Sequence, residues 1–276
     1  MKMTEVPLGK IPEVPPGAVL TIAGSDPSGG AGIQADLKVF SYLGLYGLSV
    51  ITALTAQNTM GVQAAYAVPP EQVATQMESL TSDFRVAVTK TGMLPNVEII
   101  EEVHERARAG HLGLLVIDPV LSSTGGFKLA QDGCAERMIS LLVPECRLIT
   151  PNLTEAARLS GRSIDSAADA MDAARALVDA GAGAACVTGG HWPGSPVDYL
   201  FDGKQMFTLE GIRIGGGEAV HGTGCLFSAA TAGFFALDED LLNAVQNAKR
   251  LVERAIADAV SPGAGMKVPS LKLRHH

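Results

Sequence analysis

Charged residues, aromatic residues and cysteines are all scarce in this sequence. Charged residues make up 18% and aromatic residues 5% of the 276 residues, while 47% are hydrophobic, a composition that excludes a disordered chain. The four cysteines, at positions 134, 146, 186 and 225, form no C-x-x-C pair, and no histidine run completes a zinc site. We therefore expect reduced thiols in a cytoplasmic protein and no disulfide framework.

A surplus of positive charge is missing as well. The chain has 21 Lys and Arg against 29 Asp and Glu, a formal net charge of -8, whereas domains that bind nucleic acid are usually basic. We expect no nucleic-acid partner. The uncharged stretches 39–70 and 219–237 contain polar residues and glycines, so buried strands and helices explain them better than membrane spans do.

Glycine is the residue in surplus. There are 31 glycines, where a chain of average composition would have roughly 19. The glycine-rich stretch Gly24–Gly32 contains part of a dinucleotide-binding pattern at Gly30-x-Gly32-x-x-Ala35, but no acidic residue lies between Asp36 and Glu71 to bind a ribose. A Walker A loop is absent from the sequence. A tight turn at positive φ explains about two of the four glycines in this stretch.

Short apolar runs alternate with helical patterns along most of the chain. We expect strands at Val19–Ala23, Leu48–Leu54, Ala87–Thr89, Leu114–Ile117, Arg147–Ile149 and Ala185–Thr188, and a hairpin of Val197–Phe201 with Gln205–Ile214. We expect helices at 31–43, 70–82, 96–109, 133–142, 153–160, 166–180, 223–236 and 239–259. This alternation predicts a single three-layer α/β/α domain with a mostly parallel central sheet at 18–260, after an extended or mobile lead-in at 1–17 and before a tail at 261–276.

Polar residues and glycines follow the predicted strands, at the sheet edge where α/β proteins bind ligands. Asp36 is an unusual residue near this edge, because it shares the apolar arc of its helix with Ile33 and Phe40. A carboxylate there is costly unless it is bonded, so Asp36 either pairs with a core group or binds a polar ligand, and we favour the ligand. Gln57 offers an amide to the same ligand.

A second glycine cluster predicts an anion site. Gly215–Gly217 and His221–Cys225 precede or open an apolar helix, and bare backbone N–H groups at a helix N-terminus bind phosphate well. Cys225 lies in the first turn, where it is either a small pocket wall or a chemically active thiol. His191 and His221 lack partners that the sequence identifies, so we interpret both as structural residues.

Oxygen ligands for Mg²⁺ are the third candidate. Asn152 and Glu155 form a Pro-Asn-x-x-Glu sequence after a strand, a pattern that also occurs as an ordinary helix N-cap. Together with Asp118 they predict a magnesium site completed by waters.

Seven motifs, in order, resemble those of the hydroxymethylpyrimidine/phosphomethylpyrimidine kinases of thiamin biosynthesis, over about residues 18–260. They are Thr21–Lys38, Val50–Thr59, Lys90–Leu94, Asp118–Val120, Thr150–Glu155, Gly189–His191 and His221–Cys225. The resemblance implies a ribokinase-like fold, ATP and Mg²⁺ as cofactors, a homodimer, and phosphorylation of an aminopyrimidine and then of its monophosphate.

The resemblance also implies roles for individual residues. Asp36 and Gln57 would hold the pyrimidine edge, in a pocket lined by Gly24, Ala31, Thr55, Met93 and Val120. The catalytic anion hole would be formed by Gly222, Thr223, Gly224 and Cys225. Asn152, Glu155, Thr188 and Gly190 would contact ATP, and Asp118 and Glu155 would serve the metal.

Thr188 stands where the family usually has a lysine, and the segments 215–220 and 121–128 also depart from the usual pattern. Two alternatives remain beside the pyrimidine kinase. One is a pyridoxal kinase of the same superfamily, and the other is a catalytically weak protein that binds or senses a pyrimidine.

Overall fold

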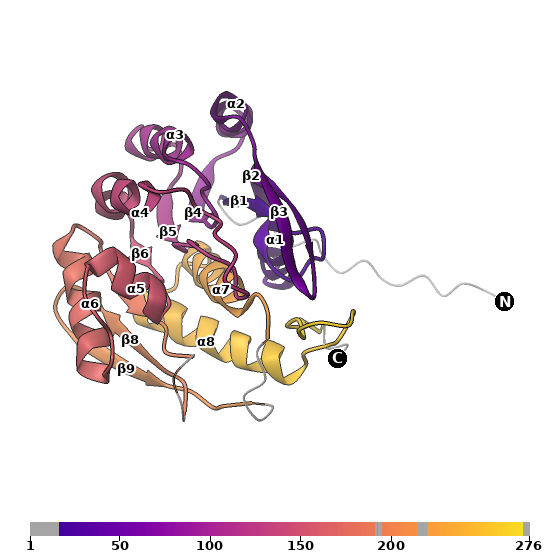
Figure 1. Cartoon of the computed structure of the whole chain (residues 1–276). Coiled ribbons are helices and arrows are strands. Elements are labelled where there is room, and N and C mark those ends of the chain that lie inside the picture. The colour runs from indigo at the N-terminus through magenta and orange to yellow at the C-terminus, as the bar shows by residue number, and fades with distance from the viewer. Residues whose placement is uncertain (1–16, 191, 193–194, 215–219, 273–276) are drawn as a thin grey trace, which may run out of the picture.

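A nine-stranded sheet organises the part of the chain that the structure describes, which is residues 17–190, 192, 195–214 and 220–272 of a computed structural model (Figure 1). The strand order is β3-β2-β1-β4-β5-β6-β7-β8-β9. The neighbours from β2 to β7 run parallel, and β3, β8 and β9 are antiparallel additions at the two edges. The strands are β1 Ala18–Ser25, β2 Gly47–Asn58, β3 Gly61–Ala67, β4 Val86–Thr91, β5 Leu114–Ile117, β6 Leu148–Ile149, β7 Ala185–Val187, β8 Val197–Phe201 and β9 Met206–Glu210.

Eight α-helices pack against the two faces of this sheet. They are α1 Gly32–Tyr42, α2 Pro70–Thr81, α3 Val97–Arg108, α4 Cys134–Arg137, α5 Leu153–Ser160, α6 Ala167–Asp179, α7 Thr223–Ala236 and α8 Leu241–Ala257. A π-helical turn, η1 Met138–Leu142, and a 3₁₀ turn, η2 Val143–Glu145, follow α4. These counts cover only the described ranges.

The strands bury both of their faces, which produces two separate cores. Leu20 and Ile22 of β1 belong to the core beneath α2 to α6, whereas Val19 belongs to the core beneath α1, α7 and α8. The same division occurs in β5, where Leu115 and Val116 point to opposite cores. This alternation explains why the strand sequences are continuously apolar, and Figure 1 shows the resulting three layers.

Helix α7 lies centrally because its residues are apolar or small on every side. Nine of its 14 residues are buried, from Leu226 to Phe235. A Cβ on Gly233 would lie 2.5 Å from Cδ1 of Leu43, so glycine permits a close approach to the end of α1. The packing fixes the N-terminus of α7 at the carboxyl edge of the sheet.

The predicted fold is confirmed as one α/β domain with a mostly parallel sheet, and the element bounds differ in places. Leu114–Ile117, Val197–Phe201 and the helix 223–236 have the predicted bounds. Strand β2 continues four residues beyond Leu54 and pairs with β3, a strand that was not predicted. The expected helix 133–142 is α4 continued by the π-helical turn.

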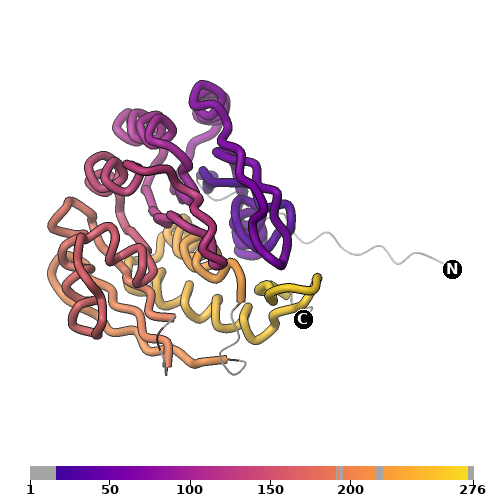
Figure 2. The backbone as a smooth tube through the Cα atoms, in the orientation of Figure 1, coloured from indigo at the N-terminus to yellow at the C-terminus, as the bar shows by residue number. Residues whose placement is uncertain are grey.

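The segment after residue 260, which the sequence predicted as a tail, packs onto the domain. Backbone N–H groups of Gly265 and Met266 donate to Oγ1 and O of Thr59, over 3.1 and 2.8 Å. Val268 forms a bridge with Val260, and Lys267 forms one with Val220. Figure 2 shows this yellow segment returning to the tip of the β2–β3 ribbon. Within the described ranges, no helix combines the length and apolarity needed to cross a bilayer.

We predict that Gly265→Ala weakens the fold, because a Cβ at residue 265 would lie 2.0 Å from the carbonyl oxygen of Thr59. The free energy of unfolding should fall by about 1–3 kcal/mol in chemical denaturation. Gly125→Ala is the matched control, because its nearest neighbour would be 3.9 Å away. Equal stability of the two variants would show that the C-terminal segment does not contribute to the fold.

Candidate active site

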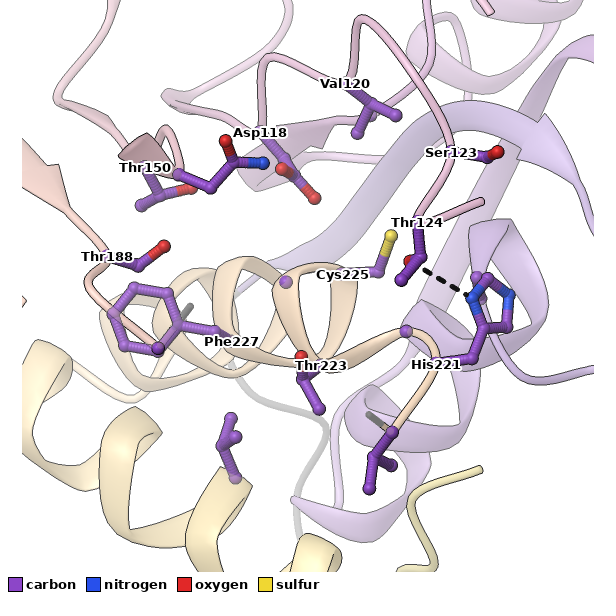
Figure 3. Close-up of a pocket in the computed structure, with 18 of the residues that line it drawn as sticks. Asp118, Val120, Ser123, Thr124, Thr150, Thr188, His221, Thr223, Cys225 and Phe227 are labelled. Atoms are coloured by element: carbon purple, nitrogen blue, oxygen red, sulfur yellow. Dashed lines mark hydrogen bonds between the residues drawn. The ribbon is translucent and has the colours of Figure 1, made fainter. Parts of the chain in front are cut away.

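One large pocket of about 710 Å³ opens at the carboxyl ends of the parallel strands. Its lining includes residues directly after β1, β4, β5, β6 and β7, as well as the start of α7. Figure 3 shows Asp118 and Val120 on one side of the pocket and Cys225 of α7 on the other. The expectation that the strand ends share one site therefore agrees with the structure.

All but one of the residues predicted for the site line this pocket. They are Gly24, Ala31, Thr55, Gln57, Met93, Asp118, Val120, Asn152, Glu155, Thr188, Gly190, Gly222, Thr223, Gly224 and Cys225. The exception is Asp36. His191 and Gly215–Gly217 lie outside the described residues.

The Asp36 carboxylate is buried beneath the pocket, in a position that excludes ligand contact. Its Oδ2 accepts a hydrogen bond from Thr21 Oγ1 at 2.6 Å and lies 2.9 Å from Nζ of Lys90. Neither Lys90 nor Asp36 exposes any side-chain surface. The structure shows the alternative, a pairing with a core group, and leaves the carboxylate no exposed surface for a ligand. The prediction that Asp36 shares the apolar arc of its helix with Ile33 and Phe40 is confirmed, because all three residues are buried.

Lys90 brings a positive charge to the floor of the pocket. Its Nζ also lies 3.7 Å from Oδ2 of Asp118. Burial lowers the pKa of Lys90, but the charges of Asp36 and Asp118 and the hydrogen bond to Asp36 outweigh this effect and raise its pKa above the ordinary value. The ammonium therefore stays charged, with carboxylates on two sides.

The loop between β1 and α1 is folded around Asp26. Its carboxylate accepts hydrogen bonds from the backbone N–H groups of Ser28 and Ala31, both at 2.8 Å, and from Ser28 Oγ at 2.7 Å. Burial raises the pKa of Asp26, but the neighbouring His221 ring and the hydrogen bonds from Ser28 and Ala31 outweigh this effect and leave the pKa below its ordinary value. Positive φ occurs at Gly29 and Gly32, which confirms that two of this loop's glycines are needed for a tight turn.

The start of α7 comes close to this loop through a glycine contact. Gly222 has φ +86°, and a Cβ there would lie 1.9 Å from the carbonyl oxygen of Gly30. Only glycine fits this approach. Helix α7 has no side-chain N-cap, so the N–H groups of its first turn, beginning at Thr223, are available to an anion in the pocket.

Cys225 has a thiol that is protonated at neutral pH. Burial raises its pKa to about 12, although the nearby Lys90 charge opposes the rise. All four cysteines are free, as the sequence predicted. A neutral thiol in this position favours the pocket-wall interpretation over the chemically active one.

Asn152 and Glu155 cap helix α5 and at the same time face the pocket. Asn152 Oδ1 accepts from the Glu155 N–H at 3.0 Å, and Glu155 Oε2 accepts from the Asn152 N–H at 2.9 Å. The ordinary capping interpretation is therefore realised as a capping box. Burial and the neighbouring Asp118 carboxylate raise the pKa of Glu155 to about 8. The raised pKa reflects unneutralised negative charge at this point, which a bound cation would relieve.

Gln57 lies within the extended strand β2, whereas the sequence placed it after the strand. Its Nε2 is 2.8 Å from Nε2 of His221, and its Oε1 accepts from Thr55 Oγ1 at 3.3 Å. His221 is buried and also contacts Thr124 Oγ1 through Nδ1 at 3.5 Å, a contact that is dashed in Figure 3. His221 thus lines the pocket and contacts a predicted site residue.

A different part of the lining is apolar and lies between the end of β9 and α8. Its side chains are Ile212, Ile214, Val252 and Ile256. Nearby, Lys249 Nζ lies 2.6 Å from Asp198 Oδ2, and Asp198 Oδ1 accepts from the Gly189 N–H at 3.0 Å. This pair fixes the loop that follows β7.

Sequence reasoning missed Lys90, Asp26 and His221 as parts of the site. Lys90 had a usable signal, because a lysine inside the apolar strand Val86–Thr91 requires a buried carboxylate. His221 had none, since its contacts with Gln57 and Thr124 join segments far apart in the chain.

Comparison with known proteins gives consistent matches. A family model described as phosphomethylpyrimidine kinase matches residues 26–270. The hydroxymethylpyrimidine/phosphomethylpyrimidine kinase of Escherichia coli (strain K12) is 44% identical over 245 residues, which cover 87% of this chain and 91% of that protein.

Two further matches differ in extent and in name. The thiamine biosynthesis bifunctional protein ThiED of Geobacter sulfurreducens is 43% identical over 91% of this chain, and the chain spans about half (51%) of its length. The crystal structure of the pyridoxal kinase from Staphylococcus aureus in complex with AMP-PCP and pyridoxal has a TM-score of 0.82 at 33% identity, with 92% of each chain covered.

We predict that Asp36→Asn destabilises the protein strongly, because it leaves the buried Lys90 charge without its nearest partner. The expected loss is about 3 kcal/mol or more in the free energy of unfolding at pH 7. Asp172→Asn, which breaks an exposed pair with Arg175, is the control and should stay within about 0.5 kcal/mol of wild type. If both substitutions cost the same, the buried pair is not a principal constraint on the fold.

Proposed function

This chain belongs to the phosphomethylpyrimidine kinase family, and we propose that it transfers phosphate from ATP to 4-amino-5-hydroxymethyl-2-methylpyrimidine and then to the monophosphate, as a step of thiamin biosynthesis. The observation that carries this proposal is the single pocket that joins Gln57 and Met93 to the uncapped start of α7. One end offers an amide for a heterocycle, and the other offers N–H groups for a phosphate.

The pyrimidine-binding part of the pocket would be formed by residues from three loops and two strands. The amide of Gln57 would face the aminopyrimidine edge, with Thr55 and Gly24 beside it. Met93 and Val120 would contact the ring, and Ala31 would close the wall near α1. Asp36 has no direct part, since it supports Lys90 beneath the ring.

Phosphoryl transfer depends on positioning and charge stabilisation more than on covalent chemistry. The N–H groups that begin with Gly222, Thr223 and Gly224 would hold the transferred phosphoryl group through hydrogen bonds and the helix dipole. Lys90 adds a fixed positive charge 3.7 Å from Asp118. The substrate hydroxyl would then be presented to the phosphate at short range.

ATP would lie along the loops that end β6 and β7. Asn152, Glu155, Thr188 and Gly190 line that part of the pocket, and the apolar side chains between β9 and α8 suit an adenine ring. Thr188 provides no charge where the family usually has lysine. The nucleotide phosphates would therefore depend on backbone N–H groups and Mg²⁺.

The residues present fit Mg²⁺, which prefers hard oxygen ligands and usually keeps several waters. Asp118 and Glu155 would hold it. Among the described residues, no cluster of three or more His, Cys, Asp or Glu side chains would hold a metal unaided, so waters and phosphate oxygens would complete the coordination. When bound, the ion would neutralise phosphate charge.

Cys225 would act as a pocket wall for the hydroxymethyl group. A general base works best with a pKa near the operating pH, and the Cys225 pKa of about 12 is far above it.

A second copy of the chain is the partner that we propose in addition to the substrates, and the cytoplasm is the location that the free cysteines suit. Leu54 and Tyr66 pair across β2 and β3, and both are more than half exposed. Apolar side chains exposed together on an edge ribbon are typical of an interface between protein chains.

The proposed activity is tested by ATP consumption with three acceptors: hydroxymethylpyrimidine, its monophosphate and pyridoxal. We expect turnover of both pyrimidines, with kcat/KM for hydroxymethylpyrimidine at least about tenfold above that for pyridoxal, and loss of activity when EDTA removes Mg²⁺. Turnover of pyridoxal alone would identify a pyridoxal kinase. Tight pyrimidine binding without turnover would identify a sensor.

The role of Cys225 is tested separately with Cys225→Ser. We expect kcat to fall less than about tenfold, because loss of a true general base typically costs 10²–10⁴-fold. The dependence of kcat on pH between about 7 and 9 should keep its shape. A fall in kcat of a hundredfold or more, with an altered pH profile, would show that the thiol acts as a general base.

A further inference from the structure

His221 connects three segments around the pocket, and the proposed function assigns it no role. Its Nε2 lies 2.8 Å from Nε2 of Gln57 and 3.6 Å from Oδ2 of Asp26. Its Nδ1 lies 3.5 Å from Oγ1 of Thr124, in the loop between β5 and α4. The side chain is only 9% exposed. A buried histidine with a polar neighbour at each nitrogen is constrained in its orientation.

The contact with Gln57 couples the proton on the ring to the orientation of the amide. An amide nitrogen is only a donor, and a neutral imidazole has one donor and one acceptor nitrogen. In the arrangement with Nε2 of Gln57 facing the ring, Nε2 of a neutral His221 accepts and its proton is on Nδ1, facing Thr124. If Nε2 of His221 carried the proton instead, Gln57 would have to turn its oxygen toward the ring. The ring therefore decides which end of Gln57 faces the substrate.

The backbone of His221 is fixed as firmly as its side chain. Its N–H donates to the carbonyl oxygen of Lys267 at 2.9 Å. A Cβ on Gly30 would lie 3.2 Å from Cδ2 of the ring and 2.8 Å from Cγ1 of Val268. The ring is thus packed between the β1–α1 loop and the C-terminal segment, and it has little freedom to move away from Gln57.

We propose that His221 is a positioning residue that fixes the orientation of the Gln57 amide and thereby sets the preference for an aminopyrimidine edge. This inference rests on the proposed function, in which Gln57 faces the substrate. An amino group next to a ring nitrogen presents one donor and one acceptor, and a correctly oriented amide matches both. A ring that offers acceptors alone does not gain from that orientation.

The experiment compares side chains that replace one or the other ring nitrogen. His221→Gln extends a polar atom to about the position of Nε2 and should keep the partner of Gln57. His221→Asn reaches only the position of Nδ1, and His221→Leu replaces neither nitrogen. His111→Leu removes an exposed histidine that is distant from His221 in the sequence, and it serves as the control. Steady-state kinetics with hydroxymethylpyrimidine, pyridoxal and ATP are measured for each variant.

We expect His221→Leu and His221→Asn to raise KM for hydroxymethylpyrimidine about tenfold and to lower the preference over pyridoxal by a similar factor. His221→Gln should stay within about threefold of wild type, and KM for ATP should stay within about twofold in all variants. Because His221 acts through Gln57, adding His221→Leu to Gln57→Leu should cause little further loss.

Several outcomes would overturn the inference. If the losses of the two single variants multiply in the double variant, His221 acts independently of Gln57. Equal defects in His221→Gln and His221→Asn would mean that the His221 side chain only fills space. If His221→Leu does not fold, the Gln and Asn variants decide alone. Failure of the proposed function looks different, because wild type would then not turn over the pyrimidine, or Gln57→Leu would leave its KM unchanged.

Discussion

The buried ion pair between Asp36 and Lys90 is the constraint on which the rest of the site depends. It joins helix α1 to strand β4 beneath the pocket, and Thr21 of β1 completes the carboxylate's hydrogen bonding. A buried charge is tolerable only with a partner in good geometry. A shift of α1, β1 or β4 relative to the others would separate the two buried charges and destabilise the fold. The floor of the pocket is rigid for this reason.

The same pair determines the charge pattern above it. Lys90 remains protonated because of the carboxylates around it, and its charge reaches both Asp118 and Cys225. With the dipole of α7 it forms the positive part of the pocket, facing the negative part at Asp118 and Glu155. A metal ion with phosphate oxygens would fit between these parts, since it satisfies the two carboxylates while its phosphates meet the N–H groups of α7.

Much of this could be predicted from the sequence, because parallel strands bring their carboxyl ends to one edge whatever the loops do. That rule placed residues as distant as Gly24 and Thr188 in one pocket. It failed for Asp36, because a helical wheel gives the direction of a side chain but not its partner, and Lys90 lies 54 residues away. Strand β3 was missed because Gly61–Ala67 is rich in alanine and only half buried, which weakens the alternation that identifies a strand.

In the proposed function, ring recognition and phosphate binding would both depend on one short stretch of backbone. His221 contacts Gln57, and the next residue, Gly222, approaches Gly30 and begins the anion-binding turn. Lys267 holds the backbone N–H of His221 from outside. A displacement of the phosphate site would therefore move the partner of Gln57 with it. This coupling through consecutive residues would hold the substrate hydroxyl at a fixed place relative to the phosphate, a condition that in-line transfer requires.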